Sequence, residues 1–224
     1  ESLHIGPFNR FAHAAAMAVA TSPGAMYNPL FLYGSAGCGK TAMLHALANK
    51  LKEQGAVAPW VTSGVRLTRA VALAQAAGRL EELRDFAAKT SVLLMDDIQL
   101  MGVTDANRKA LSALLRGFIA SGKQLVLTSA LPPGALRAWE QVLEVQLAAG
   151  HAVEIKTPSA SAQSEVIVQE LARLGFDAEQ ANEERVQRIA AVFPGLNAVV
   201  SRLRTLMRLS PAAASGGLDG LLRL

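Results

Sequence analysis

An eight-residue loop near the start of the sequence fits a phosphate-binding pattern without a mismatch. The pattern is a glycine, four residues, a second glycine, a lysine and a hydroxyl residue, and it is met by Gly34, Ser35, Ala36, Gly37, Cys38, Gly39, Lys40 and Thr41. The glycines let backbone N–H groups approach phosphate oxygens without a Cβ in the way. Lys40 can then reach the β- and γ-phosphates, and the Thr41 hydroxyl can bind Mg²⁺. The loop predicts a site for ATP or ADP with Mg²⁺.

The segments on either side of this loop are the ones that it needs. Residues 29–33 read as a buried strand, and residues 42–51 read as a helix. A strand that leads through the loop into a helix N-terminus points several backbone N–H groups and the positive end of the helix dipole at one place. A chance glycine-rich turn would not require these flanks, so the context favours a functional loop.

Two adjacent carboxylates, Asp96 and Asp97, follow the apolar run at residues 92–95. In parallel sheets, ligands bind at the carboxyl ends of the strands. We expect Asp96 to hold Mg²⁺, directly or through water, next to Thr41. Asp97 is the expected catalytic residue, which orients or activates the attacking water. An acid pair at a strand end is explained equally well as a strand cap when it stands alone, but together with the phosphate loop it indicates a nucleotide site.

The elements that must position these residues alternate between strand and helix. Strands are expected at residues 30–33, 57–62, 92–95, 124–128 and 152–155, and helices at residues 9–20, 42–51, 65–88 and 105–120. The third helix breaks near Gly78, and Asp105 is the expected N-cap of the fourth. This alternation predicts an α/β fold with a parallel five-stranded sheet and helices on both faces.

The pattern changes at Pro158, after which only helices are expected, at residues 161–174, 179–192 and 196–209. The sequence therefore predicts a nucleotide-binding α/β domain at residues 1–157, a small helical lid at residues 158–210 and a loose tail at residues 211–224. The last of these segments is rich in Pro, Ala, Gly and Ser.

The composition restricts the classes of function. The 224 residues suffice for one α/β domain and a small appendage, and the net charge of +4 permits contact with nucleic acid. No apolar stretch approaches the length of a membrane span and no signal peptide is visible, so we expect no membrane partner and a cytoplasmic location. The single cysteine, Cys38, excludes an internal disulfide, and the four histidines lack partners at zinc spacing. The chain begins with Glu1 rather than Met, which indicates an excised or processed piece.

Several further segments resemble the AAA+ domain of the DnaA family, the bacterial replication initiators. They are residues 6–16 (GPFNRFAHAAA), 27–34 (YNPLFLYG), 96–100 (DDIQL) and 124–129 (QLVLTS), the last followed by Pro132 and Pro133. The resemblance covers about residues 3–158 well and the lid weakly. It implies an AAA+ P-loop NTPase in which Ile5, Gly6 and Asn9 lie beside the adenine.

The same resemblance implies that the helical pair before Asp96 contacts single-stranded DNA and neighbouring subunits. The cations of this pair are Arg66, Arg69, Arg79 and Arg84. Pairing with Glu81, Glu82 and Asp85 at helical spacing explains them slightly better than a nucleic-acid track does. Any contact with single-stranded DNA is therefore expected to be weak.

Polar and cationic groups that the family uses late in the reaction are missing. Ala130 stands where the family has Asp, and Gln146 stands in the place of the arginine finger that reaches the neighbour's ATP. The lid arginine that touches the γ-phosphate has no counterpart in residues 195–199, and Arg202 and Arg204 lie about a turn further on. Ala87 and Ala88 replace a tyrosine–arginine pair. Because an arginine finger is worth roughly 10³–10⁵ in rate, slow or absent hydrolysis is expected.

The expected function is a DnaA-like nucleotide switch with weak intrinsic hydrolysis, related to DNA replication initiation or its regulation. Its expected partners are other AAA+ subunits or a regulatory protein. One alternative is a degenerate AAA+ interaction module of a larger regulatory or signalling protein that does not bind DNA. Another is a helicase-loader or transposition-helper ATPase, against which Gln146 and the missing lid arginine argue. No helix-turn-helix is readable after the lid, so sequence-specific duplex binding is not expected.

Overall fold

The computed structural model of the chain describes residues 3–55, 59–146, 150–176, 181–192, 200 and 203–205. The chain forms two compact units. One comprises Glu1–Ser35 and Lys40–Ile155, and the other comprises Ala36–Gly39 and Lys156–Leu224. The division into domains at residues 1–157, 158–210 and 211–224 stays a prediction, and residues 211–224 lie outside the described residues.

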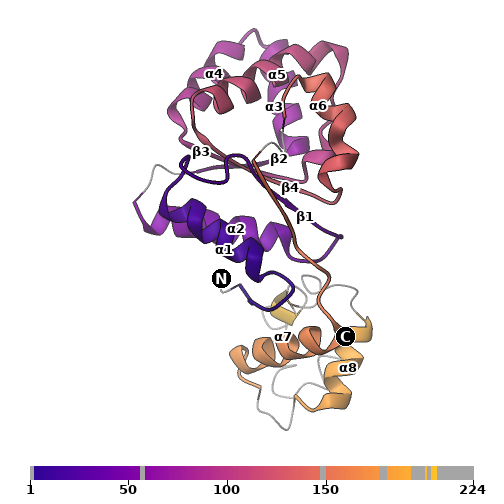
Figure 1. The fold of residues 1–224 in the computed structure, drawn as a ribbon. Helices are drawn as coiled ribbons and strands as arrows, with labels where there is room; N and C mark the ends of the chain where they lie inside the picture. Colours follow the sequence, from indigo (N-terminus) through magenta and orange to yellow (C-terminus); the bar gives the residue numbers. More distant parts are fainter. Residues whose placement is uncertain are drawn as a thin grey trace. The chain divides into compact units, whose positions relative to one another are not determined.

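The first unit is built on a five-stranded parallel sheet, as the sequence predicts (Figure 1). The strands are β1 (Leu30–Tyr33), β2 (Trp60–Ser63), β3 (Val92–Asp96), β4 (Gln124–Ser129) and β5 (His151–Glu154). Their order is β2-β3-β4-β1-β5, with every neighbouring pair parallel. Strand β4 therefore separates β1, which leads into the phosphate loop, from β3, which ends in the acids.

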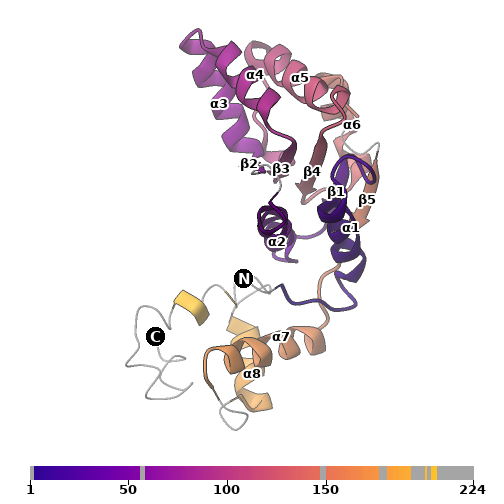
Figure 2. The same cartoon turned by 90° about the vertical axis from the view of Figure 1, so that its left-hand side faces the viewer.

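Helices cover both faces of this sheet (Figures 1 and 2). On one face lie α1 (Arg10–Thr21) and α2 (Lys40–Glu53), and on the other lie α3 (Gly64–Ala76), α4 (Leu80–Lys89), α5 (Asp105–Ala120) and α6 (Arg137–Leu143). The central strands β3 and β4 are buried along almost their whole length, which is why they read as continuous apolar runs. A large buried cluster fills the space between the sheet and the second helical layer, and it includes Phe31, Leu67, Leu93 and Leu115. The predicted α/β class is confirmed.

Most element boundaries differ from the predicted ones by a few residues. Two of these differences, at β2 and at the start of α5, are informative. Strand β2 begins at Trp60 rather than at residue 57, and residues 56–58 lie outside the described residues. The N-cap of α5 is Thr104 and not Asp105, because the Thr104 hydroxyl accepts from the Asn107 N–H while the Asn107 amide accepts from the Thr104 N–H at 2.8 Å. Asp105 occupies the first helical turn instead, where its charge favours the positive end of the helix dipole.

Three short elements had no predicted counterpart. They are helix α6 and two 3₁₀ turns, η1 (Ile98–Leu100) and η2 (Pro133–Leu136). Each spans seven residues or fewer, too short for a hydrophobic period to stand out. The turn η1 directly follows Asp97, the residue that the sequence predicts to act on water.

The second unit contains α7 (Ala160–Arg173) and α8 (Glu183–Val192), which are close to the predicted helices at residues 161–174 and 179–192. They enclose a separate buried cluster of Ile167, Leu171, Phe176, Val186, Ile189 and Leu203. The helix expected at residues 196–209 lies mostly outside the described residues. In the described part of the chain, no helix combines the length and apolar character needed to cross a membrane.

Candidate nucleotide-binding site

The phosphate loop occupies the whole connection between β1, which ends at Tyr33, and α2, which begins at Lys40. Gly37 and Gly39 have φ angles of +79° and +106°, in the left-handed region that glycine adopts without strain. Cys38 between them is buried, which fits a small residue that fills the loop. At the start of the loop, the Gly34 N–H donates to the Ser129 carbonyl at 3.2 Å and so attaches the loop to the end of β4.

Lys40 is buried, with 6% of its surface exposed. Its ammonium group donates to the carbonyls of Gly34 and Ser35, both at 2.8 Å. These two hydrogen bonds hold the Lys40 ammonium group against the phosphate loop. A nucleotide phosphate would replace carbonyl oxygens as the acceptor, and a bond between two charged groups is the stronger of the two.

Asp96 lies where three elements of the first unit meet. The Thr41 hydroxyl, at the start of α2, donates to Asp96 Oδ2 at 2.8 Å. The Thr128 hydroxyl, on β4, donates to Asp96 Oδ1. The structure therefore brings together the two residues that the sequence analysis assigned to Mg²⁺, although they lie 55 positions apart.

This pair suits a magnesium ion. Mg²⁺ is usually held by one or two carboxylates together with phosphate oxygens and water, so a hydroxyl and a carboxylate in contact match its needs. Within the described residues, no group of three or more His, Cys, Asp and Glu side chains gathers to hold a metal. The Thr41–Asp96 pair fits an ion that is shared with a bound phosphate.

Asp97 adopts a left-handed backbone conformation, with φ 48° and ψ 57°. Such a conformation is uncommon for a residue other than glycine, and it persists where the surroundings enforce it. Here the Asp97 N–H donates to Thr128 Oγ1 at 2.9 Å, and α3 begins so close that a Cβ on Gly64 would lie 2.7 Å from the Asp97 carbonyl oxygen. The acid predicted to act on water is thus held by its backbone from two sides.

The predicted adenine side is a tight turn before α1. Asn9 is 4% exposed, and its amide donates to the His4 carbonyl at 2.8 Å and accepts from the Gly6 N–H at 2.9 Å. The structure therefore brings Gly6 and Asn9 together and uses the Asn9 side chain to hold the turn. Ile5 is 54% exposed. The contact of these three residues with adenine stays a prediction.

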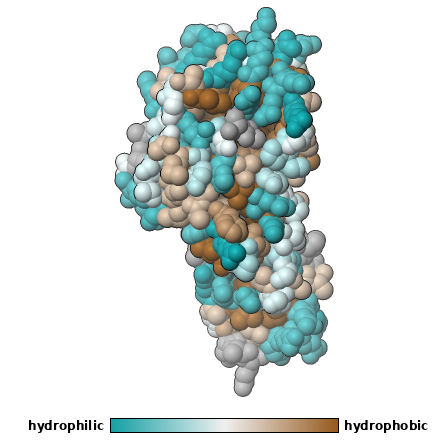
Figure 3. Space-filling view, in the orientation of Figure 1, coloured by the Kyte–Doolittle hydropathy of each residue, from teal (hydrophilic) through white to brown (hydrophobic). Residues whose placement is uncertain are grey.

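The four arginines of α3, of α4 and of the α4 N-cap divide into two groups. Arg79 pairs with Glu82 and Arg84 pairs with Glu81, each at 2.5 Å, as the helical spacing suggested. The hydrogen bond from Arg79 lowers the pKa of the Glu82 carboxyl, and the same bond raises the pKa of Arg79. Arg66 and Arg69 on α3 are exposed and have no ion pair with any described residue. Hydrophilic residues cover most of the visible surface of the helical layer α3–α6, at the top of Figure 3.

Three residues stand at or near positions where the family has arginines that act on ATP: Gln146, Arg202 and Arg204. Gln146 is exposed on the surface. Arg204 forms an ion pair with Glu170, a carboxylate that is only 2% exposed. Such a buried charge depends on its partner, so Arg204 has a structural role in the second unit. Arg202 and residues 195–199 lie outside the described residues.

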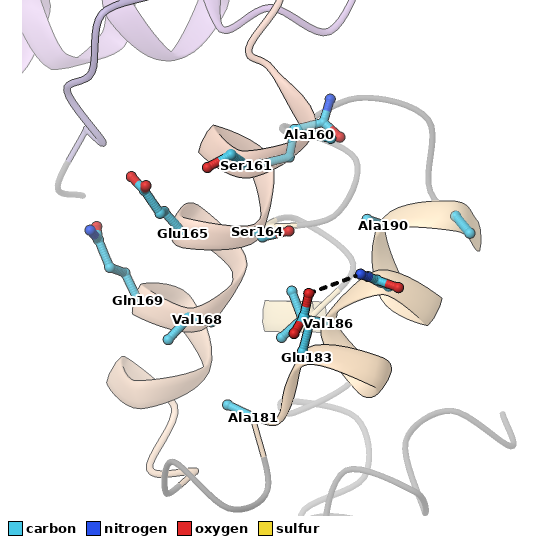
Figure 4. Close-up of a pocket in the computed structure, with 13 residues that line it drawn as sticks. Ala160, Ser161, Ser164, Glu165, Val168, Gln169, Ala181, Glu183, Val186 and Ala190 are labelled. Carbon is cyan, nitrogen blue, oxygen red and sulfur yellow. Dashed lines mark hydrogen bonds between the residues drawn. The ribbon is translucent and has the colours of Figure 1, made fainter.

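A hollow of about 1000 Å³ lies between α7 and α8 of the second unit (Figure 4). Its walls combine apolar side chains, such as Val168 and Val186, with the carboxylates Glu165 and Glu183, and Glu183 accepts a hydrogen bond from Gln187 at 3.3 Å. None of the described residues that line it is a lysine, arginine or histidine. This hollow therefore does not suit a nucleotide phosphate, and the candidate site stays with the phosphate loop and the acids.

Two residues of the site were missed by sequence reasoning. One is Thr128, which contacts both acids, and the other is Gln99, whose amide donates to Asp97 Oδ1 at 2.9 Å. A signal for Thr128 was present, because β4 runs beside β3 in a parallel sheet and ends in the polar pair Thr128–Ser129. Gln99 lies two residues after Asp97, but its contact depends on the left-handed turn at Asp97.

Comparison with known proteins gives the family of the chain. The bacterial DnaA ATPase domain matches residues 1–154. The chromosomal replication initiator protein DnaA of Chloroflexus aggregans is 33% identical over 167 residues, which cover 74% of this chain and 35% of that protein. The chain thus spans about a third to a half of the length of the curated relatives that it matches.

Solved structures share the fold. Domain III of the Thermotoga maritima replication initiation protein DnaA has a TM-score of 0.82 at 24% identity, over 98% of this chain and 92% of that one. A replication initiator DnaA bound to AMPPCP and single-stranded DNA has a TM-score of 0.79 at 22% identity, over 92% of this chain and 63% of that one. With the matched family, the five-stranded sheet and the phosphate loop in agreement, this chain belongs to the bacterial DnaA ATPase domain family.

Proposed function

We propose that this chain binds ATP or ADP with Mg²⁺ at residues 34–41 and Asp96, and that it acts as a nucleotide switch in DNA replication initiation or its regulation. The observation that carries the proposal is the 2.8 Å hydrogen bond between Thr41 and Asp96. It joins the end of the phosphate loop to the end of the acidic strand at the point where a nucleotide-bound Mg²⁺ would need both oxygens.

In this proposal each part of the site has a separate task. The loop N–H groups and the N-terminus of α2 hold the phosphates, and Lys40 exchanges its carbonyl acceptors for the β- and γ-phosphate oxygens. Thr41 and Asp96 would hold Mg²⁺, which would neutralise phosphate charge. Ile5, Gly6 and Asn9 lie beside the adenine.

Hydrolysis is proposed to be weak. Asp97 would orient or activate water, but Ala130 and Gln146 supply no charge to the transition state. Positioning and Mg²⁺ then act without the arginine that contributes most in related phosphoryl transfer. Such a site converts bound ATP to ADP slowly, so the ATP state persists, as a switch requires.

The proposed partners follow from the family and from the exposed cations of α3. A relative of the same fold is bound to AMPPCP and single-stranded DNA, which supports nucleotide binding and a weak contact between single strands and the exposed Arg66 and Arg69. Other AAA+ subunits or a regulatory protein are the proposed protein partners.

Calorimetric titration with MgATP and with MgADP tests the proposal. The unmutated chain should bind both nucleotides, and Lys40→Ala should abolish the binding while circular dichroism shows an unchanged fold. Lys50→Ala is the matched control, since Lys50 lies on the same helix and its ammonium pairs at 3.4 Å with Glu53 instead of with the loop. Failure of the unmutated chain to bind at millimolar nucleotide would refute the proposal and favour an interaction module.

A further inference from the structure

We propose that Gln99 is a positioning residue for Asp97, because its side-chain amide links the backbone that follows β4 to the Asp97 carboxylate, next to Ala130, which has no polar side chain. The inference rests on the proposed function, since Asp97 would act on the water that attacks the bound nucleotide. It adds a residue of η1 to the site.

Both ends of the Gln99 amide are engaged. Gln99 Nε2 donates to Asp97 Oδ1 at 2.9 Å, and Gln99 Oε1 accepts from the Ala130 N–H at 3.2 Å. A backbone N–H can only donate and a carboxylate can only accept, so the two neighbours determine which end of the amide faces which. The contact is therefore directional, and a flipped amide would lose both bonds.

The backbone at the end of β3 brings Gln99 into this position. The left-handed conformation of Asp97 turns the chain out of the strand, and the Leu100 N–H closes the turn onto the Asp97 carbonyl at 3.0 Å. Gln99 then lies beside the side chain of Asp97. Thr128 and Gly64 fix the Asp97 backbone, and Gln99 is the described residue that holds its side chain.

This arrangement leaves half of the carboxylate free. Among the described residues, Asp97 Oδ1 accepts the bond from Gln99, whereas Oδ2 has no hydrogen-bond partner. Oδ2 can therefore accept a proton from water while the bond at Oδ1 limits rotation of the group. Placement of a catalytic group matters steeply, since an error of about 1 Å can cost on the order of 10²-fold in rate.

The competing explanation is that Gln99 has only a structural role and attaches η1 to the end of β4. The two explanations predict different effects of a Gln99 substitution on the hydrolysis rate. Loss of a structural contact lowers the free energy of unfolding and leaves the rate of the chemical step unchanged. Loss of a positioning residue lowers the rate of the chemical step at constant affinity for nucleotide.

The experiment compares Gln99→Leu and Gln99→Glu with the unmutated chain. Leucine keeps the size and removes both hydrogen bonds, and glutamate keeps the shape and removes the donor. Single-turnover hydrolysis of radiolabelled MgATP gives the rate constant at saturation, calorimetry gives the Kd, and Asp97→Ala sets the background rate. Gln75→Leu is the control, because the Gln75 amide also bridges two elements, with a 2.9 Å bond to the Ala106 carbonyl.

We expect both Gln99 variants to lower the rate constant by roughly 10- to 100-fold with the Kd within about twofold, and Gln75→Leu to leave the rate unchanged. An unchanged rate in both Gln99 variants, with or without a lower Tm, would overturn the inference and leave the proposed binding intact. An unmutated rate no higher than that of Asp97→Ala would also overturn it. Absence of nucleotide binding by the unmutated chain would instead refute the proposed function itself.

Discussion

The hydroxyl of Thr128 lies between the two acids of the site: it donates to Asp96 Oδ1 and accepts from the Asp97 N–H at 2.9 Å. Thr128 is fully buried on β4, the strand that separates β3 from β1. One side chain therefore sets the position of the predicted Mg²⁺ ligand and of the residue predicted to act on water.

Thr128→Val should destabilise the protein by roughly 1–3 kcal/mol, because valine has nearly the same shape but leaves the Asp97 N–H without its acceptor. Urea denaturation followed by circular dichroism measures the change. Thr128→Ser keeps the hydroxyl, so its loss of stability should be smaller. A valine variant as stable as the unmutated chain would show that the hydroxyl contributes nothing to the fold.

Steady-state ATP hydrolysis by the unmutated chain should lie well below the roughly 1–10³ s⁻¹ typical of enzymes. The physical reason is the absence of a charged group at positions 130 and 146, where Ala130 and Gln146 stand. Gln146→Ala should therefore leave the rate unchanged. If the unmutated chain hydrolyses ATP fast and Gln146→Ala lowers the rate, Gln146 has a role in the reaction and the prediction is wrong.

ATP should have little effect on self-assembly. The family resemblance implies head-to-tail contacts in which one subunit's arginine reaches its neighbour's ATP, and such contacts can propagate as an open helix. Gln146 is exposed and can offer a neutral hydrogen bond, which is about half as strong as a charge-assisted one. Sedimentation velocity with ADP and with a non-hydrolysable ATP analogue should give the same small species.

Gln146→Arg is the converse variant. It should shift the same measurement towards larger species in the presence of the ATP analogue, provided that the other contacts of the interface remain. Large assemblies of the unmutated chain that form only with the ATP analogue would contradict the account.

Binding to single-stranded DNA should be weak and should depend on Arg66 and Arg69 more than on Arg79 and Arg84. The first two are exposed without an ion pair to any described residue, whereas the other two are paired with Glu82 and Glu81. Each DNA phosphate that a variant no longer neutralises should make the slope of log K against log salt shallower by about 0.7.

Fluorescence anisotropy across a salt series separates the two groups. Arg66→Ala and Arg69→Ala should each reduce the slope, while Arg79→Ala and Arg84→Ala serve as matched controls of equal charge change. Equal effects in all four variants would mean that net charge alone sets the affinity. A salt-resistant complex with one duplex sequence would contradict the expectation that this chain reads no base sequence.

The parts of the fold that could be predicted are those that a local sequence pattern determines. Strands β1, β3 and β4 are buried on both faces, so their apolar runs are visible without any tertiary information. The phosphate loop was recognisable because its spacing and its flanking elements are required together. The N-cap of α5 was misassigned because Thr104 and Asp105 are both good caps, and the choice depends on the reciprocal bonds with Asn107.

The parts of the site that were missed depend on contacts between distant segments. Thr128 meets Asp96 through the register of two strands, which places Met95 opposite Leu127 and so brings the next residues together. Gln99 reaches Asp97 only because the chain makes a left-handed turn at that residue. Neither relationship follows from residue type or spacing alone.

The effect of Mg²⁺ on ADP affinity, determined by calorimetry with and without the ion, tests whether Thr41 and Asp96 hold the metal. Mg²⁺ should strengthen ADP binding to the unmutated chain, and Thr41→Val and Asp96→Asn should each remove this gain while binding of ADP without Mg²⁺ persists. Thr21→Val, which loses a hydroxyl that bonds to the Met17 carbonyl at the end of α1, should keep the gain in full. A Mg²⁺ effect that survives in both site variants would contradict the assignment of Thr41 and Asp96 as the metal-holding pair.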